Sequence, residues 1–153
     1  MSSLQVDSIS SMGGGHVDGA GKVVQFKDAN TTTETTISAN VRDTICTLTF
    51  TPKLSNSLIL CQGFHSNDAA VSSTSYCNAY ILAGVTEVCR GEAVGYNDTK
   101  LGDARYQYSY SGLIPSWGTT SLVIKIDVLA VRGDWTVSRA LLRTSLYVWE
   151  IAQ

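Results

Sequence analysis

The chain has 153 residues, enough for one domain whose core needs neither a metal nor a disulfide to fold. Only 16% of the residues are charged, against about 25% in an average soluble protein, and the net charge is −2. The chain therefore lacks the basic surface of a nucleic-acid-binding protein, and no stretch is apolar for long enough to predict a transmembrane helix. Its 18 serines and 16 threonines replace the missing charges, which predicts a β-rich protein with an uncharged polar surface.

Residues 1–21 are interpreted as an arm and a hinge, and residues 22–153 as one domain. The arm starts with the polar MSSLQVDSIS and ends in GGGHVDGAG, where the glycines permit backbone angles that other residues avoid. Leu4, Val6 and Ile9 are its spaced apolar positions. We expect them to dock on the chain's own domain or on a neighbouring chain. The start has neither the basic nor the apolar region of a secretory signal peptide, so we expect none.

The first half of the domain is predicted to consist of strands. Residues 22–26 form a short strand, and the threonine-rich residues 28–38 form an exposed strand or a β-rich loop. Residues 43–50 and 58–65 are two β-rich runs joined by a loop that contains proline, asparagine and serine. Such a pair predicts a hairpin.

The second half continues the same pattern. Residues 75–82 and 85–90 flank an Ala-Gly turn, which predicts a second hairpin. Residues 104–112 carry alternating tyrosines, and residues 121–131 form the longest predicted strand. One face of that strand is predicted to be apolar and consists of Leu122, Ile124, Ile126, Val128 and Ala130. Residues 140–152 have period two and several β-branched or aromatic side chains, so they predict a strand rather than a helix. These roughly eight to ten strands predict an all-β fold, a single antiparallel, jelly-roll-like β-sandwich with an extended N-terminal arm.

No motif predicts a catalytic, cofactor-binding or metal-binding residue. Four cysteines, at 46, 61, 77 and 89, lack a C-x-x-C pair, and only two histidines accompany them. We interpret all four as small buried thiols. Cys46 and Cys61 are also candidate cross-strand neighbours, because they lie nearly opposite each other in the first predicted hairpin.

Two titratable residues are interpreted as structural. His65 ends a predicted strand, and no nucleophile-elbow serine is present to complete a triad with it. Asp127 lies in the longest apolar strand, with Lys125 two residues earlier on the same face. This spacing predicts a solvated or ion-paired outer face.

Aromatic residues supply the candidate binding surface. Tyr106, Tyr108 and Tyr110 alternate along one strand and lie on one face. Tyrosine suits recognition because it combines a large apolar ring with a polar tip. Three alternatives stay open for this stripe: core packing, a subunit interface, or a receptor surface. Trp117, in the loop that follows, is a further candidate for the surface.

The order of these segments resembles that of short virion proteins of tailed bacteriophages. The start MSSLQVDSIS resembles M-S-x-[LI]-x-V-D-x-I, and TLTFTPKLSNSLIL contains a match to T-x-T-P-x-x-x-x-S-x-[IL]-[LI]. The end, Val148-Trp149-Glu150-Ile151-Ala152, resembles a closing [LV]-x-x-E-[IL]-A, with one residue fewer between Val148 and Glu150. GKVVQF, a threonine-rich tract, a tyrosine-rich strand and a long apolar strand come between them in the same order. The loop GLIPSWGTT departs from the Leu-Asp-x-Pro type, so we expect its local contact to differ.

The resemblance implies a tail-fibre, tail-spike or capsid-decoration domain that assembles as a homotrimer and has no catalytic residues. We favour a capsid decoration (cement) protein, because the chain is an arm plus one domain without a stalk. Its partners would be its own copies and the major capsid protein or another virion protein, in a virion assembled in the host cytoplasm. The alternative is a receptor- or glycan-binding module of a tail fibre, and a remote one is a small β-sandwich hydrolase. We expect no cofactor, nucleic-acid partner or membrane.

Overall fold

The computed structural model describes residues 21–69, 75–95, 105–115, 117–138 and 143–153. These residues form strands joined by turns and loops, and none of them is helical. Consequently, no helix in this part of the chain is long and apolar enough to span a bilayer. In chain order the strands are β1 (Val23–Thr31), β2 (Thr35–Ile37), β3 (Arg42–Phe50), β4 (Leu58–Ala69), β5 (Ser75–Ala83), β6 (Thr86–Gly95), β7 (Arg105–Pro115), β8 (Leu122–Arg132), β9 (Trp135–Val137) and β10 (Thr144–Ile151).

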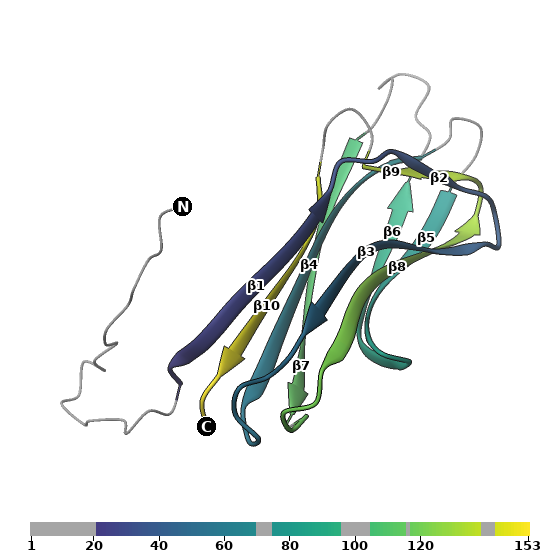
Figure 1. The fold of residues 1–153 in the computed structure, drawn as a ribbon. Coiled ribbons are helices and arrows are strands. Elements are labelled where there is room, and N and C mark those ends of the chain that lie inside the picture. The colour runs from purple at the N-terminus through teal and green to yellow at the C-terminus, as the bar shows by residue number, and fades with distance from the viewer. Residues whose placement is uncertain (1–20, 70–74, 96–104, 116, 139–142) are drawn as a thin grey trace, which may run out of the picture.

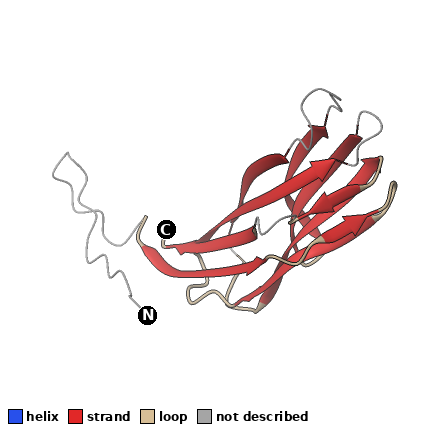
Figure 2. Ribbon diagram, turned by 90° about the horizontal axis from the view of Figure 1, so that it is seen from above, coloured by secondary structure: helices blue, strands red, loops and turns tan. Residues whose placement is uncertain are grey.

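The strands form two antiparallel sheets that face each other (Figures 1 and 2). Sheet A has the order β1-β10-β4-β9-β2, and β7 pairs with the other edge of β4. Sheet B has the order β3-β8-β5-β6. This arrangement confirms the predicted all-β sandwich.

The pairing of the eight long strands is that of a jelly roll. β1 pairs with β10 and β4 with β7 in sheet A, while β3 pairs with β8 and β5 with β6 in sheet B. The chain thus behaves as one long hairpin rolled up so that its successive strand pairs alternate between the sheets. The short strands β2 and β9 pair with each other at one end of sheet A.

The core lies between the sheets and is built from alternating positions of each strand. In β8 the predicted apolar face is fully inside, since Leu122, Ile124, Ile126, Val128 and Ala130 are all buried. The opposite sheet contributes the buried residues Ile59 and Cys61 of β4 to the same core. A side chain in a strand points to the same face as its second neighbour, so one alternating run in each strand is enough to build this core.

The predicted hairpin of residues 43–50 and 58–65 is wrong. β3 pairs with β8 in sheet B, whereas β4 pairs with β10 and β7 in sheet A. The connection, residues 51–57, therefore crosses from one sheet to the other. It is longer than the about two to five residues of most hairpin loops. Cys46 and Cys61 consequently lie in different sheets as buried, free thiols rather than as cross-strand neighbours.

The other strand predictions mostly agree with the structure. β5 and β6 form the predicted second hairpin, in which Ala83 pairs with Thr86 and Gly84 has a φ of 61°. Residues 144–151 form a strand, as their period of two predicts. Part of the threonine-rich stretch extends β1, and part forms the separate β2. β9 was not predicted, because its three residues looked like part of a turn.

Candidate functional site

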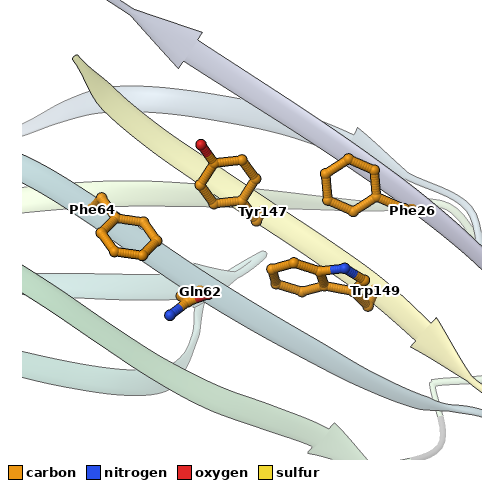
Figure 3. Close-up of a pocket in the computed structure, with 5 residues that line it drawn as sticks. All are labelled: Phe26, Gln62, Phe64, Tyr147 and Trp149. Atoms are coloured by element: carbon orange, nitrogen blue, oxygen red, sulfur yellow. The ribbon is translucent and has the colours of Figure 1, made fainter. Parts of the chain in front are cut away.

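Four aromatic side chains gather on the outer face of sheet A. They come from three neighbouring strands, and Gln62 lies among them (Figure 3). We call this set the aromatic patch; it consists of Phe26 from β1, Tyr147 and Trp149 from β10, and Gln62 and Phe64 from β4.

Strand register brings the patch together. Phe26 is paired directly with Trp149, and Tyr147 is paired with Gln62. The row through Trp149 continues onto Leu60 in β4 and Leu113 in β7. An apolar row thus crosses four strands, beside a row that includes Gln62. Directly paired side chains on one face of a sheet lie within contact distance, which explains how residues from distant parts of the sequence form one surface.

Three of the rings form a nearly continuous surface. The ring centroids of Phe26 and Trp149 are 5.3 Å apart, those of Tyr147 and Trp149 5.9 Å, and those of Phe26 and Tyr147 6.1 Å. The angles between their planes are only 40°, 32° and 17°, respectively. Phe64 instead meets Tyr147 edge-on, at 79° and 5.7 Å. Three tilted faces and one ring at a steep angle therefore enclose a shallow hollow of about 280 Å³.

The patch is open to solvent and its lining is uncharged. Phe26 is 48% exposed, and Leu113 at the end of the same row is 54% exposed. No Asp, Glu, Lys or Arg side chain lines the hollow. Apolar groups that gather on a surface in this way, beside a few polar groups, mark binding surfaces more often than scattered single residues do.

The predicted tyrosine stripe is divided by the structure. Tyr110 is only 8% exposed and belongs to the core. Tyr108 is partly buried against the core and stacks on His65, with ring centroids 5.5 Å apart. Core packing is therefore the alternative that the structure supports for both residues. Tyr106 pairs with Asn67 through the backbone, and its side chain lies outside the described part of the structure.

The remaining predicted site residues do not join the aromatic patch. Trp117 is 38% exposed in the loop after β7 and is not among the residues that line the hollow. Leu4, Val6 and Ile9 lie outside the described residues.

Asp127 is held in an ion-paired cluster on the outer face of sheet B. Its carboxylate lies 3.0 Å from Arg42 Nε and 3.4 Å from Lys125 Nζ, and it accepts a hydrogen bond of 2.7 Å from the Thr44 hydroxyl. The Arg42 guanidinium also lies over the Tyr80 ring, 4.1 Å from its centroid. Of the two alternatives for this face, solvated or ion-paired, the structure shows the ion pair with Lys125. Arg42 is a second partner that the sequence did not predict, because it lies on β3. With these partners, the Asp127 carboxylate has a structural role and needs no catalytic explanation.

Glu150 is a fully buried carboxylate that binds the loop between β3 and β4. It accepts hydrogen bonds from the Lys53 amide at 2.9 Å, the Leu54 amide at 2.7 Å and the Gln25 side chain at 2.7 Å. Burial by itself raises the pKa of the Glu150 carboxyl, but the hydrogen bonds that it accepts lower it more, so the pKa lies below its ordinary value. The carboxylate therefore stays charged and fixes the loop at the point where the chain passes between the sheets.

The cysteine thiols lack the features of reactive groups. Cys46, Cys61 and Cys77 are buried as expected, whereas Cys89 is only half-buried. Burial raises the pKa of the Cys46 and Cys89 thiols, and it raises that of Cys61 to about 12. Each of these three therefore stays a protonated, weakly nucleophilic thiol at neutral pH. Within the described residues, no three His, Cys, Asp or Glu side chains are grouped as metal ligands.

We expect the protein to lose stability in mild acid because of the buried His65. It is 1% exposed, and burial lowers its pKa from 6.5 to about 4. Between these two values the unfolded chain binds a proton at His65 and the folded chain does not. The free energy of unfolding should therefore fall by about 3 kcal/mol as the pH drops from 6.5 to 4. Urea unfolding at several pH values across this window measures the loss.

The matched variant for this prediction is His65→Gln, which keeps a polar side chain but cannot titrate. Its stability should depend less steeply on pH between 6.5 and 4 than that of the wild type. Equal slopes for the two proteins would show that His65 does not cause the loss.

Comparisons with known proteins identify similar folds but no family. No family model and no curated protein matches the chain. A solved structure of infectious bursal disease virus, Gx strain, is similar over 84% of this chain and 32% of that chain, with 13% identity and a TM-score of 0.50. T=1 particles derived from infectious bursal virus match over 85% and 32%, with 16% identity and a TM-score of 0.50. The chain thus spans about a third of the length of each of these viral chains, and at such identity the likeness shows a shared β-sandwich fold.

Proposed function

We propose that this chain is a non-enzymatic structural protein of a tailed-bacteriophage virion, namely a capsid decoration (cement) protein. It assembles as a homotrimer, and its N-terminal arm clamps adjacent major capsid subunits through Leu4, Val6 and Ile9. One observation carries the proposal: Glu150 binds the amides of Lys53 and Leu54. These residues lie in two of the segments by which the sequence resembles phage virion proteins, so the fold brings these two segments into direct contact.

The chemistry of the described residues supports a structural rather than an enzymatic role. Asp127 is engaged by two cations and a hydroxyl, and Glu150 by backbone amides. His65 and Cys61 are buried, with pKa values that keep both neutral at pH 7. A general acid, base or nucleophile needs access to a substrate, and these four groups are instead enclosed by the fold. The β-sandwich shared with a viral structure is consistent with the same role.

Deleting residues 1–15 tests the role of the arm. We expect the truncated protein to keep its oligomeric mass, because the sandwich would supply the trimer contacts, and to lose attachment to phage capsids. Co-sedimentation with capsids that lack the protein measures attachment, and light scattering measures the mass. A protein with Gly13–Gly15 replaced by serines is the control, since it changes the hinge but keeps Leu4, Val6 and Ile9.

Undiminished attachment of the truncated protein would contradict the clamp. A truncated protein that becomes monomeric would instead place the trimer contacts in the arm, and would contradict the expected division of roles.

The aromatic patch favours a second candidate function, a receptor- or glycan-binding module associated with a phage tail. Exposed aromatic faces and an amide around an open hollow suit recognition of a ligand. The surface for this function would be the patch on sheet A rather than the tyrosine stripe of β7, because Tyr110 is in the core.

A further inference from the structure

We propose that the aromatic patch is a binding site for a neutral saccharide. A pyranose ring would stack on the surface formed by Phe26, Tyr147 and Trp149, and the Gln62 amide would hydrogen-bond a hydroxyl at its edge. The inference deepens the second candidate function by naming the ligand class of the same site, and it is independent of the proposed role of the N-terminal arm in capsid attachment.

The ring geometry provides the stacking surface. Phe26 and Tyr147 are tilted by only 17° to each other, and Figure 3 shows both rings with their faces turned the same way, beside Trp149. A pyranose with equatorial hydroxyls has an apolar face of C–H groups and a polar edge. Its apolar face can cover exposed aromatic faces while its hydroxyls stay in contact with water or polar side chains. An extended surface of three adjoining rings, two of them nearly parallel, therefore fits a chain of such sugars better than a compact apolar group.

The polar group of the hollow is placed where a sugar edge would lie. Gln62 is paired with Tyr147 on one side and with Ser111 of β7 on the other, and Tyr147 is paired in turn with Asp28 of β1. A row with polar groups thus runs beside the apolar row of Phe26 and Trp149. An amide offers both donors and an acceptor, as does a sugar hydroxyl. Two adjacent rows, one apolar and one polar, match the two sides of a saccharide.

The lining carries no charged side chain, which favours a neutral ligand over an anionic one. Nucleic acids and acidic polysaccharides are bound with the help of Lys or Arg, and none lines the hollow. Lys27 lies next to Phe26 in sequence, but its ammonium points toward the carbonyl of Thr49 in β3, 3.5 Å away. Asp28, the charged residue paired with Tyr147 beside the hollow, is negative and disfavours an acidic polymer there. The uncharged lining thus complements an uncharged sugar, in particular a polymer of equatorially substituted hexoses such as a β-glucan.

The test measures saccharide binding by the full chain. Affinity electrophoresis in gels containing a soluble β-glucan, a galactomannan or dextran compares neutral polymers, and alginate serves as the acidic one. We expect retardation by at least one neutral polymer and none by alginate. Titration with oligosaccharides of the retarding polymer, followed by tryptophan fluorescence, gives the dissociation constant.

Variants locate the site. Trp149→Ala and Phe26→Ala should each weaken binding about tenfold or more, because each removes one stacking face. Gln62→Leu keeps the size of the side chain without its amide and should weaken binding about fivefold. The controls are Trp117→Ala and Val123→Ala, two exposed residues outside the hollow, which should change the constant less than twofold. Circular dichroism melts establish that each variant is folded, and Phe26→Ala removes the most exposed of the four rings if Trp149→Ala is unstable.

Three outcomes would overturn the proposal: no neutral polymer is bound, alginate alone is bound, or Trp149→Ala and Phe26→Ala bind as well as the wild type. Light scattering of the same variants tests the other possible occupant of the patch, a second copy of the chain. If they dissociate the oligomer while the wild type binds no saccharide, the patch is a contact between copies of the chain. Capsid attachment, tested above with the arm deletion, does not involve these residues, so failure of one proposal leaves the other standing.

Discussion

Replacing Glu150 with alanine is expected to lower the free energy of unfolding by about 3 kcal/mol at pH 7. The carboxylate has no exposed surface and accepts hydrogen bonds from two backbone amides of the β3–β4 loop. Alanine would leave the amides of Lys53 and Leu54 without their acceptor. A buried donor left unpaired costs about 1–3 kcal/mol, and hydrogen bonds to a charged acceptor lie at the upper end of that range.

The pH dependence of the same contact has a definite sign. Because the folded protein holds the pKa of Glu150 below its ordinary 4.5, the contact stabilises fully above pH 4.5. This contribution is lost as the pH falls from 4.5 through the lower folded pKa. Glu150→Ala should lack this part of the acid transition, so wild type and variant should become more alike in stability as the solution is acidified.

Urea unfolding at pH 7 and hydrogen exchange of the Lys53 and Leu54 amides measure the effect. Both amides should exchange faster in the variant while those of β8 stay protected. Glu92→Ala is the matched control, because it removes a carboxylate that is paired with Arg90 at 2.8 Å on the exposed surface, and it should leave stability unchanged within error. A loss below about 1 kcal/mol in Glu150→Ala would show that the loop is held by other contacts.

Local patterns predicted strands more reliably than they predicted strand partners. The alternation in residues 121–131 identified both β8 and its buried face, because side-chain direction depends only on neighbours in the chain. The partner of β3 depends instead on where the chain goes after Phe50. A loop with proline, asparagine and serine can return beside the same strand or cross to the opposite sheet. The signal for crossing was a distant residue, Glu150, whose contact with this loop cannot be seen without the fold.

The aromatic patch was hidden from the sequence for a related reason. Alternation separated Tyr147 and Trp149 from the inward residues of β10, and it separated Phe64 from the inward residues of β4. That these faces adjoin each other and Phe26 follows from the strand order β1-β10-β4, which spans almost the whole chain. Conversely, the tyrosine stripe was conspicuous in the sequence, but Tyr110 fills the core. Aromatic alternation marks one face of a strand without telling which face is inside.

Replacing Tyr110 with alanine is expected to destabilise the protein by about 4 kcal/mol, the largest single effect that we predict. The ring lies against two glycines on opposite sheets. A Cβ built on Gly63 would come within 2.6 Å of the Tyr110 ring, and one on Gly91 within 3.2 Å. Since neither glycine has a side chain that can move into the vacated space, the cavity would stay nearly at full size. Aromatic-to-alanine changes in cores cost about 3–5 kcal/mol, and the cost rises with the volume left empty.

Tyr110→Phe is the matched variant, and it should not lower the free energy of unfolding. The Tyr110 hydroxyl is buried and has no hydrogen-bond partner among the described residues, and burial raises its pKa well above the ordinary value of 10. Removing an unpaired buried hydroxyl while keeping the ring should therefore leave stability unchanged or raise it by up to about 1 kcal/mol. Urea unfolding of the two variants separates the contributions of ring and hydroxyl. If Tyr110→Phe were as unstable as Tyr110→Ala, the hydroxyl rather than the packing of the ring against Gly63 and Gly91 would stabilise this part of the core.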